Sequence, residues 1–130
     1  MGKQYDDSRF GVLKILTFPG HCDLISAAGN ISQMTFEEDI ILTEFGVVMT
    51  ETMNITAASI ATVQLREGST VLGEISLGTG STIGSIYSTT TLTTTAIDAG
   101  NTLIWYRNVS TLTIGECDGY VKYRERYVSG

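Results

Sequence analysis

Short β-prone runs separated by glycine follow one another along the whole chain. Several alternate apolar and polar residues with a period of two, which is typical of a half-buried strand. Ala61, Val63 and Leu65 share one face of such a run, and Val71 to Leu77 alternates in the same way, with Val71, Gly73, Ile75 and Leu77 on one face. Strands are predicted over Gly11–Phe18, Cys22–Ala27, Asp39–Met53, Ser59–Arg66, Val71–Leu77, Ile83–Thr95, Asn101–Arg107 and Gly119–Val128.

The glycine-containing segments between these runs predict turns, and the chain as a whole predicts very little helix. Glu67 to Thr70 is expected to form a hairpin loop, because Gly68 can adopt a positive φ. Ile31–Phe45 is the best helix candidate, with Asn30 or Ser32 as its N-cap, but its apolar residues do not keep a 3.6-residue period. We therefore expect one short helical turn there at most.

About eight strands with regular turns predict an all-β fold, an antiparallel β-sandwich of one domain over residues 1–130. Jelly-roll, immunoglobulin-like and small-barrel topologies all fit this pattern. An immunoglobulin domain places a tryptophan soon after its first cysteine, whereas Trp105 lies twelve residues before Cys117. This position favours a jelly-roll-like sandwich.

Residues Thr79–Thr95 are unusually rich in hydroxyl side chains, with eleven Ser and Thr in seventeen positions. A glycan-decorated stalk and an ice-binding threonine array are two functional interpretations. An ice-binding face needs the array on several strands, and here it occurs once. We expect an exposed or edge strand, where threonine keeps β-propensity without an adhesive apolar surface.

Charge excludes two classes of partner. Fourteen acidic residues against eight basic ones give a net charge of −6, so phosphate backbones and anionic membranes would repel the chain. No apolar run approaches the roughly 18 residues of a transmembrane helix, and the first residues lack the apolar stretch of a signal peptide. We expect a soluble protein with no direct nucleic-acid or membrane partner.

The chain carries few charges for its size. Hydrophobic residues make up 42% and charged residues 17%, so fewer charged side chains cover the surface than is usual for a small monomer. Part of the surface is therefore expected to be covered by other chains, as in a homodimer or homotrimer.

Cys22 and Cys117 are the two cysteines, and 94 residues lie between them. A disulfide closing so long a loop would stabilise the fold by about 4–5 kcal/mol in the chain-entropy model. Without a secretion signal, two reduced thiols are the expected state. A zinc site with His21 is the alternative, but adjacent strand residues point to opposite faces, so we expect no metal.

No catalytic motif stands out. Glu44, Glu51 and Glu74 lie in predicted strands, and a pair of them facing across a groove would suit glycoside hydrolysis. With fourteen acidic residues, chance pairs are expected. We expect no enzyme activity and no cofactor.

Two charge patterns suggest a partner surface. Lys122, Arg124 and Arg126 alternate along the last predicted strand and therefore share one face, and Glu37 to Asp39 form an acidic run. Such groups are commonly solvated. In an assembly they would set the register between neighbouring subunits.

The C-terminal half resembles a known family. Ile97-Asp98-Ala99-Gly100-Asn101-Thr102-Leu103 enters a strand ending in Trp105-Tyr106-Arg107, and Gly115-Glu116-Cys117-Asp118-Gly119 leads into an aromatic last strand. This arrangement over residues 40–128 resembles the small jelly-roll cement (decoration) proteins of tailed bacteriophages, although Asn101 replaces the commoner Asp.

The resemblance implies a structural role on the outer surface of the virion, with assembly in the host cytoplasm. Cement proteins bind the major capsid protein and clamp neighbouring capsomers, and the family has no catalytic residues to transfer. Residues 1–10 precede the first predicted strand and would form a docking arm, with Tyr5, Arg9 and Phe10 as its contacts.

The alternative function is a receptor- or glycan-binding jelly-roll module from a phage fibre or an adhesin. Such a module needs exposed aromatic side chains along a shallow groove. Trp105, Tyr106, Tyr87 and Tyr120 are the candidates. Binding to empty capsid shells, compared with binding to cells or glycan arrays, separates the two hypotheses.

Overall fold

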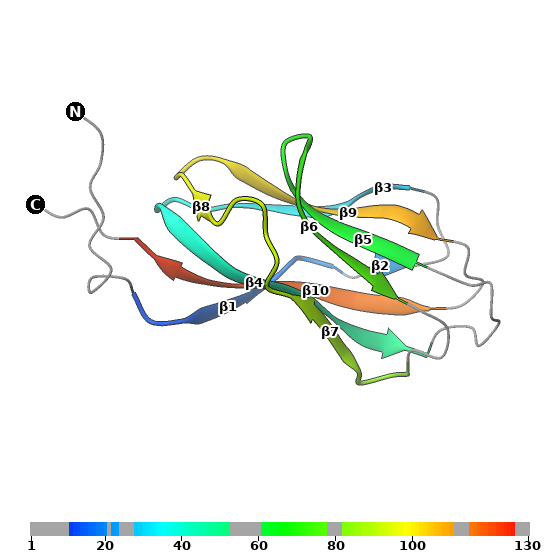
Figure 1. The fold of residues 1–130 in the computed structure, drawn as a ribbon. Helices are drawn as coiled ribbons and strands as arrows, with labels where there is room; N and C mark the ends of the chain where they lie inside the picture. The colour runs from blue at the N-terminus through cyan, green and yellow to red at the C-terminus, as the bar shows by residue number, and fades with distance from the viewer. Residues whose placement is uncertain are drawn as a thin grey trace, which may run out of the picture.

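The computed structural model describes residues 11–20, 22–23, 28–52, 61–77, 82–110 and 115–126. Within these ranges the chain forms ten β-strands and no helix (Figure 1). The strands are β1 (Lys14–Thr17), β2 (Cys22–Asp23), β3 (Gly29–Thr35), β4 (Ile40–Glu51), β5 (Ala61–Glu67), β6 (Thr70–Leu77), β7 (Ile86–Thr89), β8 (Ala96–Ile97), β9 (Thr102–Ser110) and β10 (Glu116–Glu125).

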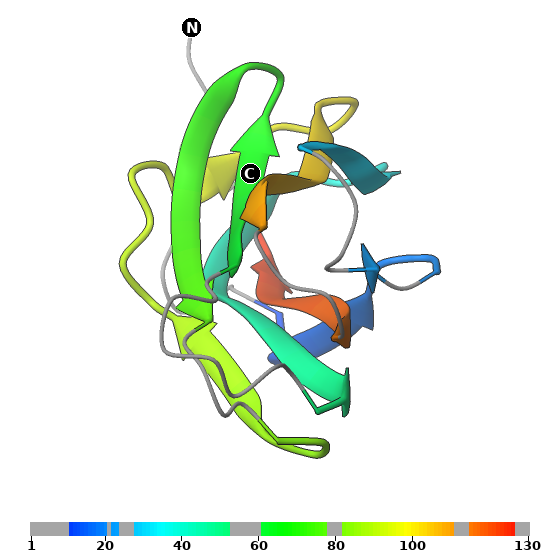
Figure 2. The same ribbon diagram turned by 90° about the vertical axis from the view of Figure 1, so that its right-hand side faces the viewer.

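The strands form two antiparallel sheets that face each other (Figures 1 and 2). One sheet has the order β1-β10-β4-β7, with β2 beside β10 and β8 beside β4, and the other has the order β3-β9-β5-β6. The eight longer strands pair in a nested way, β1 with β10, β3 with β9, β4 with β7 and β5 with β6. This nesting is the jelly-roll topology. The predicted all-β, jelly-roll-like sandwich is confirmed.

The core fills the space between the two sheets. Ala61, Val63 and Leu65 are buried on the inner face of β5, as their alternation predicts. Trp105 on β9 is completely buried, and its ring centroid lies 5.8 Å from that of Phe18. Gly119 on β10 makes room for the indole, because a Cβ atom there would lie 2.8 Å from the indole ring. At this point the two sheets therefore pack through a tryptophan that faces a glycine.

The predicted hairpin joins β5 to β6. Glu67 pairs with Thr70, and Gly68 has a φ of 62°, so glycine occupies the first central position of a two-residue turn. The predicted inner face of β6 is wrong at one position. Leu65 pairs with Gly73 but Arg66 pairs with Val71, so Leu72 is an extra residue in a β-bulge. Leu72 is therefore buried, and Val71 turns to the partly exposed outer face.

No helical turn forms within Ile31–Phe45, which agrees with the expected limit of one short turn. Residues 29–35 form β3, which pairs with β9, and β4 begins at Ile40. Asn30 and Ser32 lie within β3 and do not cap a helix. The polar, half-exposed sequence of this edge strand has no strong strand pattern of its own, and its pairing with β9 determines its conformation. In the predicted strand Cys22–Ala27, β2 covers Cys22–Asp23 and residues 24–27 lie outside the described part.

The hydroxyl-rich segment is an edge strand only over β7. Residues 90–95 form no strand, and the two-residue strand β8 follows them. Thr93 bonds to β6 instead, through its N–H to the Leu72 carbonyl (2.8 Å) and its Oγ1 to the Val71 carbonyl (3.0 Å). The Leu92 side chain packs where a side chain on Gly73 would lie. The segment therefore closes the sandwich beside the bulge in β6.

Candidate functional site

An exposed apolar edge is the most unusual surface feature. Strand β1 pairs with β10 on one side, and no described strand pairs with its other side. Val12 is 72% exposed and Ile15 is 62% exposed, and Leu13 and Leu16 are also exposed. We call Val12, Leu13, Ile15 and Leu16 the apolar edge. Exposed apolar edge strands present unpaired backbone groups to other chains, and natural proteins usually protect them with charge.

The one charged side chain within β1 is held by its own sheet. Lys14 Nζ lies 3.0 Å from Glu125 Oε1 on β10. A lysine on an edge strand opposes the addition of another strand when its charge faces the solvent. Because Glu125 neutralises Lys14, this protection is weak along the apolar edge.

The predicted docking arm, with Tyr5, Arg9 and Phe10, lies outside the described residues. The chain is anchored immediately after it, at Gly11. The Gly11 N–H donates to the Glu125 carbonyl (2.9 Å), and Arg124 Nη1 donates to the Gly11 carbonyl (3.1 Å). The described part of the chain therefore begins with a residue that two neighbouring residues of β10, Arg124 and Glu125, hold in place.

The three predicted cations of the last strand do not form one free stripe. Lys122 and Arg124 lie on the face of β10 opposite to Tyr123, which packs on Phe36 with the ring centroids 4.8 Å apart. Lys122 Nζ lies 3.6 Å from Glu44 Oε2, and Arg124 holds Gly11. Arg126 follows β10, and its side chain is only 7% exposed. A role for these residues in setting the register of neighbouring subunits stays a prediction.

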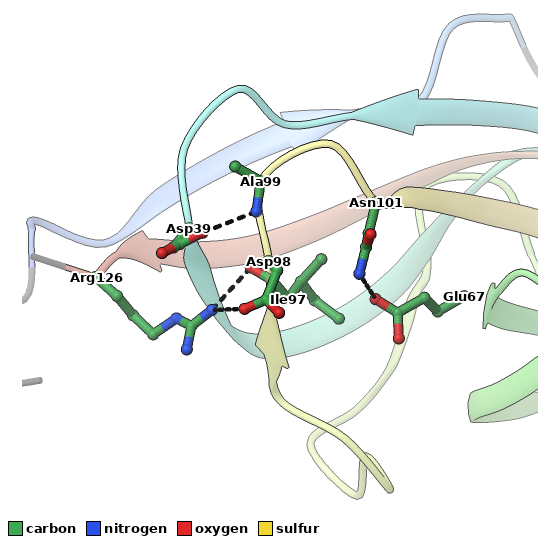
Figure 3. Close-up of polar contacts among 7 residues, drawn as sticks. All are labelled: Asp39, Glu67, Ile97, Asp98, Ala99, Asn101 and Arg126. Atoms are coloured by element: carbon green, nitrogen blue, oxygen red, sulfur yellow. Dashed lines mark hydrogen bonds and ion pairs between the residues drawn. The ribbon is translucent and has the colours of Figure 1, made fainter. Parts of the chain in front are cut away.

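Arg126 belongs to a polar cluster at one end of the sandwich (Figure 3). Its Nη2 donates to the Ile97 carbonyl (2.9 Å) and to Asp98 Oδ1 (3.2 Å). Its backbone N–H donates to the Asp39 carbonyl (2.9 Å), and Asp39 Oδ1 accepts the N–H of Ala99 (2.8 Å). We call these five residues the turn cluster. It fixes the turn before β9, which is part of the motif that resembles the decoration proteins.

A shallow groove lies beside the turn cluster. Gly100 has a φ of 87° and its N–H donates to the Phe36 carbonyl (2.9 Å), while Asn101 Nδ2 donates to Glu67 Oε2 (3.2 Å; Figure 3). The groove has a volume of about 420 Å³. An amide and a carboxylate at its wall would bind hydroxyl groups. Its lining consists of Glu67, Gly68, Gly100, Asn101, Thr102 and Ile104.

The aromatic side chains considered for glycan binding do not line this groove. Trp105 is in the core and Tyr120 is buried, while Tyr87 is half-buried and packs against the core. Tyr106 faces outward, but the Arg66 guanidinium covers its ring at 3.6 Å from the centroid. The structure therefore gives no aromatic platform among these four residues.

The outer face of β5 is covered by a ladder of polar side chains. Arg66 Nε donates to Gln64 Oε1 (2.8 Å), and Gln64 Nε2 donates to Glu74 Oε2 (2.6 Å). Together with the stacking of Arg66 on Tyr106, this ladder explains why Gln64 is buried on a face that alternation predicts to be exposed.

The three carboxylates considered for glycoside hydrolysis are dispersed. Glu44 and Glu51 lie seven residues apart in β4, which corresponds to about 23 Å at the rise of a strand. Glu44 accepts a hydrogen bond from Tyr120, Glu51 accepts the N–H of Gly115 (3.0 Å), and Glu74 bonds to Gln64 in the other sheet. Glycosidase pairs lie within about 10 Å of each other. That the protein is no enzyme stays a prediction.

Tyr120 lies flat over Gly46 on the outer face of the larger sheet. A Cβ atom on Gly46 would overlap the phenol ring, and the Tyr120 hydroxyl donates to Glu44 Oε2 at 2.7 Å. Burial, the hydrogen bond to Glu44 and the negative charge of Glu44 together raise the pKa of Tyr120 to about 12.

We expect this raised pKa to appear in an alkaline titration. The neutral phenol is the favoured form in the fold, so its contribution to stability is complete below pH 10 and is lost as the pH rises towards 12. Tyrosinate absorbance should be recorded for the wild type and for Tyr120→Phe. The difference between the two curves should rise near pH 12, and a difference centred at pH 10 would contradict the hydrogen bond to Glu44.

Cys22 and Cys117 lie directly opposite each other in the β2–β10 ladder, and both are buried free thiols. His21, the third residue of the possible zinc site, lies outside the described residues. Among the residues that the structure describes, no group of three or more His, Cys, Asp and Glu side chains is placed to hold a metal ion. The metal-free state stays a prediction.

Sequence reasoning missed two features of these sites. It did not place Asp39 and Arg126 around the Ile97–Asp98 turn, and it did not place Arg107 near Cys22, where Nη1 lies 3.7 Å from the sulfur. The partners are distant in the chain, and they come together only through the jelly-roll topology. The acidic run 37–39 drew attention to Asp39, but it gave no sign of the residues that Asp39 contacts.

Comparisons with known proteins return no relative of this chain. No family model matches it, and neither the curated proteins nor the solved structures contain a significant match. Among the described residues no helix is long and apolar enough to span a membrane. The resemblance to decoration proteins therefore stays a prediction from the sequence.

Proposed function

We propose that this protein is a capsid decoration (cement) protein, which binds the outside of a bacteriophage head and stabilises contacts between capsomers. The observation that carries the proposal is the apolar edge on β1, within a jelly-roll sandwich. An exposed apolar strand edge with its one lysine neutralised needs a protein partner to cover it. A lattice of identical capsomers supplies many copies of such a partner, and repeated weak contacts add up through avidity.

The proposed partners are the major capsid protein and further copies of this chain, as a dimer or a trimer. The apolar edge supplies buried area. Lys122 and Arg124 lie beside it, and in this proposal they exchange or share their present contacts with Glu44 and Gly11 to set the register with a partner. The proposed location is the outer surface of the virion, after assembly in the host cytoplasm. Nucleic acid, membrane, cofactor and catalysis have no part in this function.

Deleting residues 1–10 is expected to abolish attachment to the head and to leave the sandwich folded. Gly11 is hydrogen-bonded to Arg124 and Glu125, so β1 keeps its attachment to β10 in the truncated protein. Co-sedimentation with empty heads of the major capsid protein encoded in the same genome measures attachment, and circular dichroism measures folding. If the truncated protein occupies heads fully, the proposed docking arm is wrong.

The stabilising role has a test of its own. Heads with and without the protein are heated and osmotically shocked, and intact particles are counted by electron microscopy. Decorated heads should survive at higher temperature. Equal survival would leave a protein that attaches to heads but does not cement them.

The alternative is a receptor- or glycan-binding module. The groove with Asn101 and Glu67 on its wall favours it, since these groups suit sugar hydroxyls. The burial of Trp105 and Tyr120 weighs against it. Binding to a glycan array or to whole cells, lost in Asn101→Ala and absent on empty heads, would favour the alternative over the cement function.

A further inference from the structure

The cysteine pair lies at one end of the core, between the two sheets. Cys117 faces inward from β10 and pairs with Met49 on one side and with Cys22 on the other. Both cysteines are completely buried in the hydrophobic core. Two thiols with 94 residues between them in the chain are therefore neighbours in space.

The backbone geometry suits a covalent bond between them. Directly opposed residues of an antiparallel pair have Cα atoms about 4.5–5.5 Å apart. Disulfides span Cα separations of about 4.4–6.8 Å. Because Cys22 and Cys117 are opposed residues of one ladder, their side chains also point to the same face of the sheet. The register therefore places the two cysteines within the Cα separation that a disulfide spans.

Arg107 makes the two sulfurs unequal. It extends from β9 in the opposite sheet, and its Nη1 lies 3.7 Å from Cys22 Sγ. A guanidinium beside a cysteine favours the thiolate, the form that reacts with oxidants. The neighbouring Cys22, burial and the negative charge of Asp118 raise the pKa of Cys117, and the positive charge of Arg107 offsets part of this rise. Cys22 is thus the better nucleophile, and Cys117 stays protonated beside it.

We propose that Cys22 and Cys117 are a reversible oxidation site, which forms an intramolecular disulfide when the protein meets a peroxide. Hydrogen peroxide is small, and β2 contributes two residues to the sheet, so a local opening of β2 gives it access. The proposal does not depend on the proposed function. It agrees with the expected reduced state, because the thiols stay reduced in a reducing compartment until a peroxide is present.

The reaction has two steps. The Cys22 thiolate attacks one peroxide oxygen, so an S–O bond forms, the O–O bond breaks, and the departing hydroxide takes a proton to become water. The Cys117 sulfur then attacks the Cys22 sulfenic acid, so an S–S bond forms, the S–O bond breaks, and hydroxide leaves with the Cys117 proton as a second water. Two thiols are oxidised to one disulfide and one peroxide is reduced to two waters.

Thiol counting after peroxide treatment of the folded full chain tests the proposal. Free thiols, titrated in denaturant, should fall from two to none, and dithiothreitol should restore both. Peptide mapping of the wild type should yield one linked peptide containing Cys22 and Cys117, and the oxidised protein should melt at a higher temperature. Two surviving thiols, disulfide-linked dimers on a non-reducing gel, or cysteine sulfinic acid in place of a linked peptide would overturn it.

Single variants test the order of reaction. In Cys117→Ser, dimedone should trap a sulfenic acid at Cys22. In Cys22→Ser, the trapping rate at Cys117 should be lower by about tenfold or more. Arg107→Met should slow the loss of wild-type thiols, and Arg107→Lys should restore part of the rate. Faster trapping at Cys117 than at Cys22 would refute the assignment of Cys22. Mapping of the wild type needs no variant, so the disulfide itself stays testable if a variant does not fold.

Discussion

Replacing Trp105 with alanine is expected to lower the free energy of unfolding by about 3–5 kcal/mol, the usual cost of removing a large buried aromatic side chain. The indole is completely buried between the sheets, against Phe18 and the bare backbone of Gly119. Neither sheet can collapse fully into the cavity that the missing indole leaves. Urea unfolding should be followed by circular dichroism, because the variant lacks the chain's single tryptophan.

Tyr106→Ala is the matched control, since Tyr106 is the next residue of β9 and faces outward. Its ring stacks under Arg66, and the loss of such a half-buried contact costs about 1–2 kcal/mol. Equal losses for Trp105→Ala and Tyr106→Ala would contradict the assignment of faces along β9.

A double-mutant cycle sharpens this test. Gly119→Ala alone should cost about 1–3 kcal/mol, because its methyl group would lie 2.8 Å from the indole, closer than van der Waals contact allows. Combined with Trp105→Ala, the same methyl group enters the vacated space. The double variant should therefore lose less stability than the sum of the two single variants.

Replacing Ile15 with lysine is expected to dissociate the proposed oligomer and to prevent the proposed attachment to heads. Ile15 is 62% exposed at the centre of the apolar edge, and lysine would bring an uncompensated charge to a strand whose own Lys14 is neutralised by Glu125. The stability of the monomer should change by less than about 0.5 kcal/mol, as is usual for surface substitutions. Sedimentation velocity measures the oligomer and urea unfolding measures stability.

Ile83→Lys is the control for this prediction. Ile83 is 66% exposed, and it lies in the turn before β7, at the opposite edge of the same sheet. The Ile83→Lys protein should keep its oligomeric state if two copies meet through their β1 edges. If both variants are monomeric, β1 of one copy meets β7 of the next, an arrangement that fits a closed trimer. Wild-type protein that is monomeric at high micromolar concentration would contradict the proposed self-association.

The sequence predicted the parts of the fold that local patterns determine. The alternation of Ala61, Val63 and Leu65 identified a buried face, and Gly68 identified the hairpin because its positive φ is a local requirement. Strand β3 was missed because its polar residues carry no strand pattern of their own. The bulge at Leu72 was missed because an extra residue in one strand is visible only against its partner.

The candidate sites were less predictable for the same physical reason. Cys22 and Cys117 could be named from the sequence, but their opposition depends on the register of β2 against β10. Arg126 was assigned to an exposed stripe by alternation. It lies beyond the end of β10, where its side chain turns back to the Ile97 carbonyl and Asp98. Contacts between residues far apart in the chain follow from topology, which alternation does not encode.

The place of β10 in the sheet has a consequence for synthesis. β10 hydrogen-bonds to β1, to β2 and to one side of β4, so three earlier strands share a partner near the end of the described chain. A nascent chain on the ribosome cannot complete this sheet until residue 125 has left the exit tunnel, and long-range pairing of this kind folds slowly. The sandwich therefore forms only after β10 has left the exit tunnel, and a ribosome that stops before residue 116 releases a chain with unpaired apolar strands that is prone to aggregate.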